Sequence, residues 1–274
     1  MILGSAAPSR GFETPDILVL GDSQITFGSG PAYLSFFRSL ARKCSDQADR
    51  RQRLMLRRMK STAVIGVRST SLREWSARSA KGKTGICDID PVLKKNAGAY
   101  GTVNRAREKY VQIGVGADFQ FCKPGVSPLE AAISPGYYQP KLLVMSFLGN
   151  AAGDWAGKPT SALQDVRQLM AQVPDGLPCV VMTTAPSFQM AANRLRLRAQ
   201  ANLQAAFQKA GGHCQFVAGM RQDTIDVMMS DKRNFRLVEG KVKDPFHPTD
   251  RGTKRYLKTV QPQVCRAVLS VLKR

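Results

Sequence analysis

The sequence predicts an α/β protein in which helices cover both faces of a central parallel sheet. Short, continuous apolar runs recur along the chain, and this pattern is typical of strands that are buried on both faces. Helical segments of about 10–20 residues separate the runs, and strands that alternate with such helices form parallel sheets. With 274 residues, 43% of them hydrophobic, the chain is long enough to bury a sizeable core.

Five apolar runs are the predicted strands. The first two, "DILVL" over 16–20 and "TAVIG" over 62–66, consist mainly of aliphatic residues, as a doubly covered strand requires. The other three follow the same pattern, and the last of them is the weakest. They span 141–147, 178–184 and 213–219.

Helices are predicted between the strands and after the last one. Leucine, alanine and basic residues fill the segment that follows the first strand, and two glycines after residue 210 supply a C-cap for a later helix. The predicted helices span 31–60, 161–173, 191–210 and the residues from Pro248 onward.

One segment, residues 75–140, interrupts this alternation. It is rich in glycine and proline and contains "KYVQIGVGADFQFC", an alternating stretch typical of a strand or hairpin. Insertions at the carboxyl edge of a parallel sheet commonly form the walls of a cleft. We therefore expect a single domain over 16–274 with an insertion over 75–140, preceded by a flexible lead-in over 1–15.

The charge balance is strongly basic. There are 41 Lys and Arg residues against 20 Asp and Glu, which gives a formal net charge of +21. Such a field attracts polyanions such as nucleic acid, anionic lipid or acidic polysaccharide. The basic residues are dispersed and match no nucleic-acid-binding signature, so specific recognition of nucleic acid is not expected. No apolar run reaches about 18 residues, so no transmembrane segment is expected either.

The cysteines favour an exported protein. Their even number suits disulfides in an oxidising compartment, and buried free thiols are the alternative. The first residues hold no signal-peptide core, so we expect a periplasmic or secreted protein whose leader is absent from this chain, with the cytoplasm as the alternative. No spacing of metal ligands occurs, and no metal site is expected. The cysteines are Cys44, Cys87, Cys122, Cys179, Cys214 and Cys265.

A Gly-Asp-Ser tripeptide ends the first predicted strand and places Ser23 at the carboxyl edge of the sheet. Ligands of open parallel sheets bind beyond this edge. A serine hydroxyl becomes a nucleophile only when a base takes its proton and donors await the oxyanion. By itself the tripeptide also fits an ordinary turn into a helix, with Asp22 or Ser23 as the N-cap.

The chain has two histidines that could supply the base. His213 is expected to be a plain surface residue. His247 lies three residues after Asp244, on a segment that Pro245 and Pro248 predict to be a loop. This spacing lets the carboxylate accept the Nδ1 proton of the imidazole while Nε2 faces a serine. A Ser-His-Asp triad is therefore predicted.

Three motifs together resemble a known family. "GDSQ" over 21–24, "LGN" over 148–150 and "DPFH" over 244–247 resemble blocks I, III and V of the GDSL/SGNH hydrolase superfamily. The resemblance implies a three-layer α/β/α sandwich of flavodoxin-like type with about five parallel strands. It also implies Ser23 as nucleophile, His247 as base and Asp244 as its orienting carboxylate.

The same resemblance implies an oxyanion hole. Its donors would be the N–H of Ser23, the side chain of Asn150 and a backbone N–H from block II. Block II is poorly marked here; Gly66 is the first choice, with Val67 and Arg68 as alternatives. Block III departs from the usual Gly-x-Asn-Asp, because alanine follows Asn150.

The expected function is a serine esterase that removes small acyl groups, with acetyl favoured, from a carbohydrate. The basic charge favours an anionic acylated glycan, and Arg68 and Trp155 are candidate substrate contacts. No cofactor is expected, and the sequence makes no prediction of the oligomeric state. An O-acyltransferase, a lipase or a thioesterase with the same triad is the alternative. A non-catalytic module that binds glycans or other polyanions is an alternative of another class.

Overall fold

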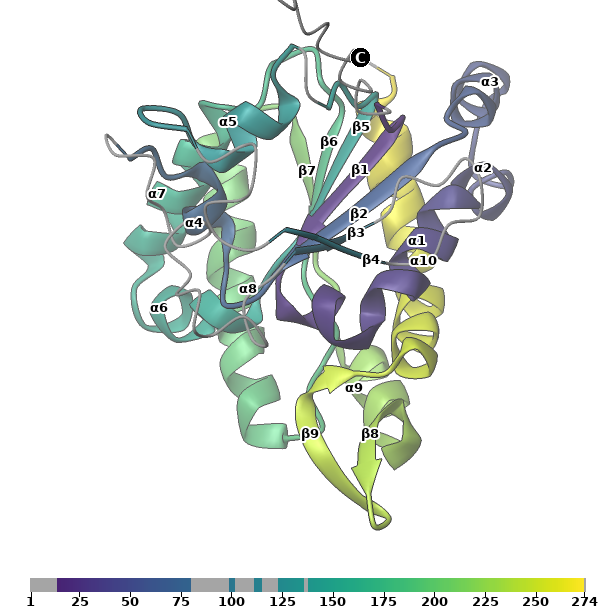
Figure 1. Ribbon diagram of the computed structural model, residues 1–274, viewed down its shortest axis with the longest axis vertical. Coiled ribbons are helices and arrows are strands. Elements are labelled where there is room, and N and C mark those ends of the chain that lie inside the picture. Colours follow the sequence, from purple (N-terminus) through teal and green to yellow (C-terminus); the bar gives the residue numbers. More distant parts are fainter. Residues whose placement is uncertain (1–13, 80–98, 102–110, 115–122, 136–137, 274) are drawn as a thin grey trace, which may run out of the picture.

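A seven-stranded sheet with helices on both faces forms the centre of the molecule (Figure 1). The computed structural model describes residues 14–79, 99–101, 111–114, 123–135 and 138–273. The strand order is β4-β3-β2-β1-β5-β6-β7. The five strands from β2 to β7 in this order are parallel, and the edge strands β3 and β4 are antiparallel. The predicted three-layer α/β/α fold is confirmed.

The five parallel strands overlap the five predicted apolar runs. Every residue of the first four is buried, because helices cover both faces of the sheet. The strands are β1 (Ile17–Gly21), β2 (Thr62–Val67), β5 (Leu142–Ser146), β6 (Cys179–Met182) and β7 (Cys214–Val217).

Two hydrophobic cores lie on the two faces of the sheet. Alternate residues of β1 face opposite cores: Leu18 and Leu20 pack with the core under α4 to α8, and Ile17 and Val19 pack with the core under α1, α2 and α10. The first group of helices comprises α4 (Leu72–Ser76), α5 (Pro128–Ile133), α6 (Ala152–Gly157), α7 (Pro159–Met170) and α8 (Met190–Ala210). On the opposite side lie α1, α2, α3 and α10 (Asp250–Val271), with α9 (Gln222–Met229) beside α10.

The prediction of one helix over 31–60 was wrong. The chain leaves the helical conformation at Ser39 and again before Asp49. Asp49 starts a new helix by a capping box: its carboxylate accepts the N–H of Gln52 at 2.8 Å, and the Gln52 side chain accepts the N–H of Asp49 at 3.0 Å. The three helices are α1 (Gly30–Arg38), α2 (Leu40–Lys43) and α3 (Arg50–Arg58).

Most of the predicted insertion over 75–140, and residues 1–13 of the predicted lead-in, lie outside the described residues. The described parts include β3 (Ala99–Gly101), β4 (Val111–Gly114) and α5. β4 lies inside the stretch that predicts a strand or hairpin, and it pairs antiparallel with β3.

A separate two-stranded sheet holds the segment around His247. It consists of β8 (Phe235–Val238) and β9 (Lys241–Pro248) and lies at the end of the molecule where the helical turn η1 (Ile25–Ser29) follows β1 (Figure 1). The prediction of a loop here was wrong, because an edge strand tolerates prolines that need no ladder partner. Pro248 also does not begin the closing helix. Thr249 is the N-cap of α10, and its Oγ1 accepts the N–H of Gly252 at 3.3 Å.

Two disulfides join described residues. Cys44 pairs with Cys265, and Cys179 pairs with Cys214 on the neighbouring strand. Cys87 and Cys122 lie outside the described residues. Within the described ranges, no helix combines the length and the apolar character needed to cross a lipid bilayer.

Candidate active site

The ends of three adjacent strands bring the site together. β1 pairs in register with β2 and β5, so that Gly21 lies beside Gly66 on one side and Ser146 on the other. The residues that follow the three strands therefore gather at one edge of the sheet. Among them are Ser23 after β1, Arg68 and Ser69 after β2, and Asn150 after β5.

Ser23, His247 and Asp244 form a continuous chain of hydrogen bonds. The Oγ of Ser23 is 2.9 Å from Nε2 of His247, and Nδ1 of the same ring is 2.7 Å from Oδ2 of Asp244. Oδ1 of Asp244 accepts the backbone N–H groups of Phe246 at 3.0 Å and His247 at 3.2 Å, which fixes the carboxylate. The structure thus brings together the three residues of the predicted triad, in the order that passes a proton from serine to imidazole.

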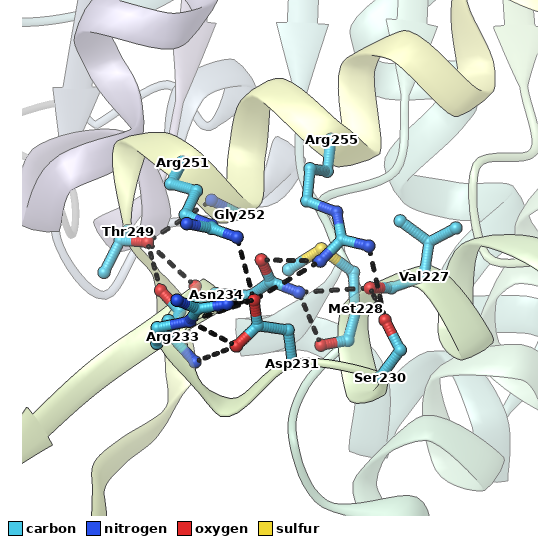
Figure 2. Close-up of polar contacts among 10 residues, drawn as sticks. All are labelled: Val227, Met228, Ser230, Asp231, Arg233, Asn234, Thr249, Arg251, Gly252 and Arg255. Carbon is cyan, nitrogen blue, oxygen red and sulfur yellow. Dashed lines mark hydrogen bonds and ion pairs between the residues drawn. The ribbon is translucent and has the colours of Figure 1, made fainter. Parts of the chain in front are cut away.

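The base of the β8–β9 hairpin is fixed by an ion-pair network around Asp231 (Figure 2). The hydrogen bonds that Arg233 donates hold the pKa of Asp231 at about 2, so the carboxylate stays charged at neutral pH. The N–H of Thr249 donates to the carbonyl of Asn234 at 2.8 Å and ties the residue after β9 to the start of β8. His247 therefore lies on a hairpin whose position is fixed by these ion pairs and hydrogen bonds. The network's arginines are Arg233, Arg251 and Arg255.

Gln24 links the loop that carries Ser23 to the β8–β9 hairpin. Its Nε2 donates to the carbonyls of Ala185 at 3.1 Å and Phe246 at 3.0 Å, and its Oε1 accepts the N–H of Ala185 at 3.1 Å. The residues next to Ser23 and His247 are thus held directly. Sequence reasoning missed this role, and the glutamine in "GDSQ" was its only signal.

The loop after β5 places Asn150 in the pocket beside the serine. Asn150 lies in the helical turn η4 (Gly149–Ala151), and its Nδ2 donates to the carbonyl of Thr70 at 2.8 Å. An amide nitrogen carries two hydrogens, so this bond orients the group and leaves a second hydrogen for a ligand.

The structure does not bring Gly66 to the pocket. Gly66 lies within β2 under Ile25, where an added Cβ would be 2.6 Å from Cγ2 of that isoleucine. The pocket is lined instead by Arg68 and Ser69, the residues just beyond the strand. Ser69 has a φ of 58°, a conformation that costs energy in a residue with a side chain and that is frequent at active sites.

The pocket is a cavity of about 440 Å³ with aromatic rims. Phe27 and Phe246 line it and are 43% and 39% exposed. The guanidinium of Arg68 lies 3.6 Å from the ring centroid of Phe27, and that ring lies 4.5 Å from the ring of His247. Arg68 is therefore at the site, as its prediction as a substrate contact requires.

Trp155 does not reach the pocket, although it was a candidate substrate contact. Its side chain is fully buried in the core beneath α6, α7 and α8, and its Nε1 donates to Asp165 at 2.8 Å. Asp165 is also paired with Arg73. The tryptophan thus packs the core and donates a hydrogen bond to a buried carboxylate.

His213 does not lie on the surface as predicted. It is 7% exposed, and its Nδ1 lies 3.3 Å from the carboxylate of Asp175. It lies directly before β7, at the end of the sheet opposite Ser23. Across the described ranges, His, Cys, Asp and Glu side chains form no cluster able to hold a metal ion.

Two buried charges complete the lining of the pocket. Asp22 is 2% exposed and accepts the N–H of Gln24 at 2.9 Å; burial raises its pKa to about 6. Arg196 comes from α8 and is 7% exposed. Neither Asp22 nor Arg196 was predicted as a functional contact. For Arg196 the reason is that nothing in the sequence near residue 196 distinguishes this arginine from its neighbours.

Comparisons with known proteins find similarity at the level of structure. No protein-family model matches the chain, and no curated protein sequence matches it. A DUF4886 family protein from Bacteroides uniformis is 9% identical, with a TM-score of 0.43 over 94% of this chain and 84% of that one. A peptidoglycan O-acetylesterase is 13% identical, with a TM-score of 0.41 over 95% of this chain and 93% of that one.

Proposed function

We propose that the protein is a serine ester hydrolase of SGNH type. The single observation that carries the proposal is the chain of hydrogen bonds from Ser23 Oγ to His247 at 2.9 Å and from His247 to Asp244 at 2.7 Å. A hydroxyl, an imidazole and a carboxylate in this order are the arrangement that activates serine toward an acyl carbon.

In the proposed reaction, Ser23 attacks the ester carbonyl while Nε2 of His247 takes the hydroxyl proton. Asp244 stabilises the imidazolium that forms. The oxyanion accepts hydrogen bonds from the side chain of Asn150 and from backbone N–H groups, for which we assign Ser23 and Ser69. His247 then protonates the leaving alcohol, and water hydrolyses the acyl-enzyme by the same steps in reverse.

The proposed substrate is a small acyl ester, with acetyl favoured, on a carbohydrate. The cavity of about 440 Å³ suits a ligand of roughly one sugar ring, and the exposed faces of Phe27 and Phe246 offer apolar surface to such a ring. The disulfides Cys44–Cys265 and Cys179–Cys214 support a periplasmic or secreted location, because disulfides persist in oxidising compartments.

Hydrolysis of p-nitrophenyl acetate, butyrate and octanoate tests the proposal. Wild type should turn over the acetate best, and Ser23→Ala should reduce kcat at least about 1,000-fold because the nucleophile is lost. Asn150→Ala should reduce kcat about 100-fold or more by removing an oxyanion donor. Ser35→Ala, an exposed serine on α1, is the matched control and should leave kcat unchanged.

Three outcomes would contradict all or part of this proposal. Turnover that survives in Ser23→Ala would show that another group performs the chemistry. A folded wild type without turnover of any ester would remove the hydrolase and leave a transferase or a binding module. A preference for octanoate would keep the hydrolase and overturn the small-acyl substrate.

A further inference from the structure

We propose that the ester substrate carries a carboxylate close to the scissile bond, and that Arg196 is the residue that binds it. This inference rests on the proposed esterase function and names a substrate class for the same pocket: O-acylated sugars that bear an acidic group.

Arg196 is placed at the centre of the site by the fold. It lies on α8, whose first turns also contribute Ala192 and Leu195 to the pocket lining. Its guanidinium lies against Gly149, the residue before Asn150, where an added Cβ would be 3.0 Å from Nη2. On the hairpin side, it lies 6.0 Å from the ring of Phe246. The cation is therefore next to the loop that carries Asn150 and faces Phe246, the residue before His247.

The hydrogen-bonding capacity of Arg196 is largely unused. Nη1 donates to the carbonyl of Ala185 at 3.2 Å, and within the described residues the guanidinium makes no other hydrogen bond. A guanidinium carries five N–H donors in a planar fork that matches a carboxylate in two parallel bonds. Because the group is 7% exposed, it is already desolvated, and an anion that reaches it meets a stronger attraction than at the surface.

The acidic residue of the pocket does not neutralise this cation directly. Asp22 attracts Arg196, yet the described residues show no ion pair within 4.0 Å between the two. The carboxylate of Asp22 instead accepts the N–H of Gln24. The pocket lining holds two guanidinium groups, from Arg68 and Arg196, against this one carboxylate, which leaves one positive charge in excess among these three groups. A substrate carboxylate would balance it.

A matched pair of substrates tests the proposal in the intact protein. The pair is a mono-O-acetylated methyl glucuronide and the corresponding mono-O-acetylated methyl glucoside, which differ only in a carboxylate against a hydroxymethyl group. Wild type should hydrolyse the glucuronide with a kcat/KM at least about tenfold higher, mainly through a lower KM, because charge-assisted hydrogen bonds form in the ground state.

Substitutions of two arginines on α8 separate recognition of the substrate's charge from a general loss of activity. Arg196→Gln should lose the preference for the acid, because its kcat/KM on the glucuronide should fall at least about tenfold more than its kcat/KM on the glucoside. Arg196→Lys keeps the charge but not the fork and should retain part of the preference. Arg198→Gln removes an exposed arginine two residues along α8 and should leave the preference intact.

The outcomes distinguish this inference from the function on which it rests. Hydrolysis of p-nitrophenyl acetate without any preference for the glucuronide in wild type would overturn the inference and keep the esterase. An equal loss on both sugars in Arg196→Gln and Arg196→Lys would show a structural role and would also overturn it. A folded protein with no turnover of any ester would overturn both.

Discussion

At the scale of the residue, Asp22 shows what burial does to a carboxyl group beside the pocket. It directly precedes Ser23 but accepts a hydrogen bond from Gln24 and lies outside the Ser23–His247–Asp244 chain. Burial raises its pKa from 3.8 to about 6, so the folded state favours the protonated carboxyl. Protonated Asp22 therefore adds to the free energy of unfolding. This contribution is fully present below pH 3.8 and is lost as the pH rises through about 6.

Asp22→Asn should therefore stabilise the protein in a pH-dependent way. Asparagine keeps the acceptor for Gln24 and cannot ionise, so the free energy of unfolding of the variant, relative to wild type, should rise by about 3 kcal/mol between pH 4 and pH 8. Urea denaturation at several pH values measures this difference. Parallel pH profiles for the two proteins would contradict the prediction.

Site residues that belong to short sequence motifs could be predicted from the sequence. Ser23, Asp244 and His247 were predicted from a strand end and local spacing, and Asn150 from the resemblance of its motif to block III. The structure places Ser23, His247 and Asn150 in the lining of one pocket, and Asp244 is hydrogen-bonded to His247. The contribution of Arg196 could not be predicted, since a single arginine in a helix with several arginines gains its position from tertiary packing. Trp155 was predicted as a substrate contact and is instead a core residue, because tryptophan side chains are mostly buried.

At the scale of the element, the hairpin β8–β9 positions His247 beside Ser23. Strands buried in the parallel sheet were predictable because two covered faces demand a continuous apolar run. β9 carries lysine, aspartate and two prolines and has no such run, so its strand depends on pairing with β8 and on the network around Asp231. The breaks within 31–60 were missed for a related reason: Asp49 forms a capping box inside a stretch whose composition favours helix.

Thr249 couples this hairpin to α10. Its Oγ1 accepts the N–H of Gly252 as the N-cap and lies 3.1 Å from the carbonyl of Asn234. Thr249→Ala should lower the free energy of unfolding by about 1 kcal/mol, a typical cost for a lost cap, whereas Thr249→Ser keeps the hydroxyl and should lower it far less. Urea denaturation compares the two variants. Equal losses would show that the methyl group, and not the cap, stabilises this junction.

At the scale of the whole molecule, the two disulfides between described residues span very different lengths of chain. Cys44, which follows α2, is joined to Cys265 on α10 across 221 residues. Cys179 and Cys214 are register partners on β6 and β7, separated by 35 residues. Both cysteines of each pair are buried, and the second pair lies at the amino ends of its strands, away from Ser23.

The longer link should stabilise the protein more. If a disulfide acts by restricting the unfolded chain, its contribution grows with loop length, to about 5 kcal/mol for the first pair and about 4 kcal/mol for the second. Urea denaturation of Cys44→Ala/Cys265→Ala and Cys179→Ala/Cys214→Ala should therefore show the larger loss in the first variant. Because neither pair contacts the pocket, kcat/KM on p-nitrophenyl acetate should stay at the wild-type value in both variants while they are folded. The reverse order of stability would mean that native packing around β6 and β7, and not the unfolded chain, determines what these bonds contribute.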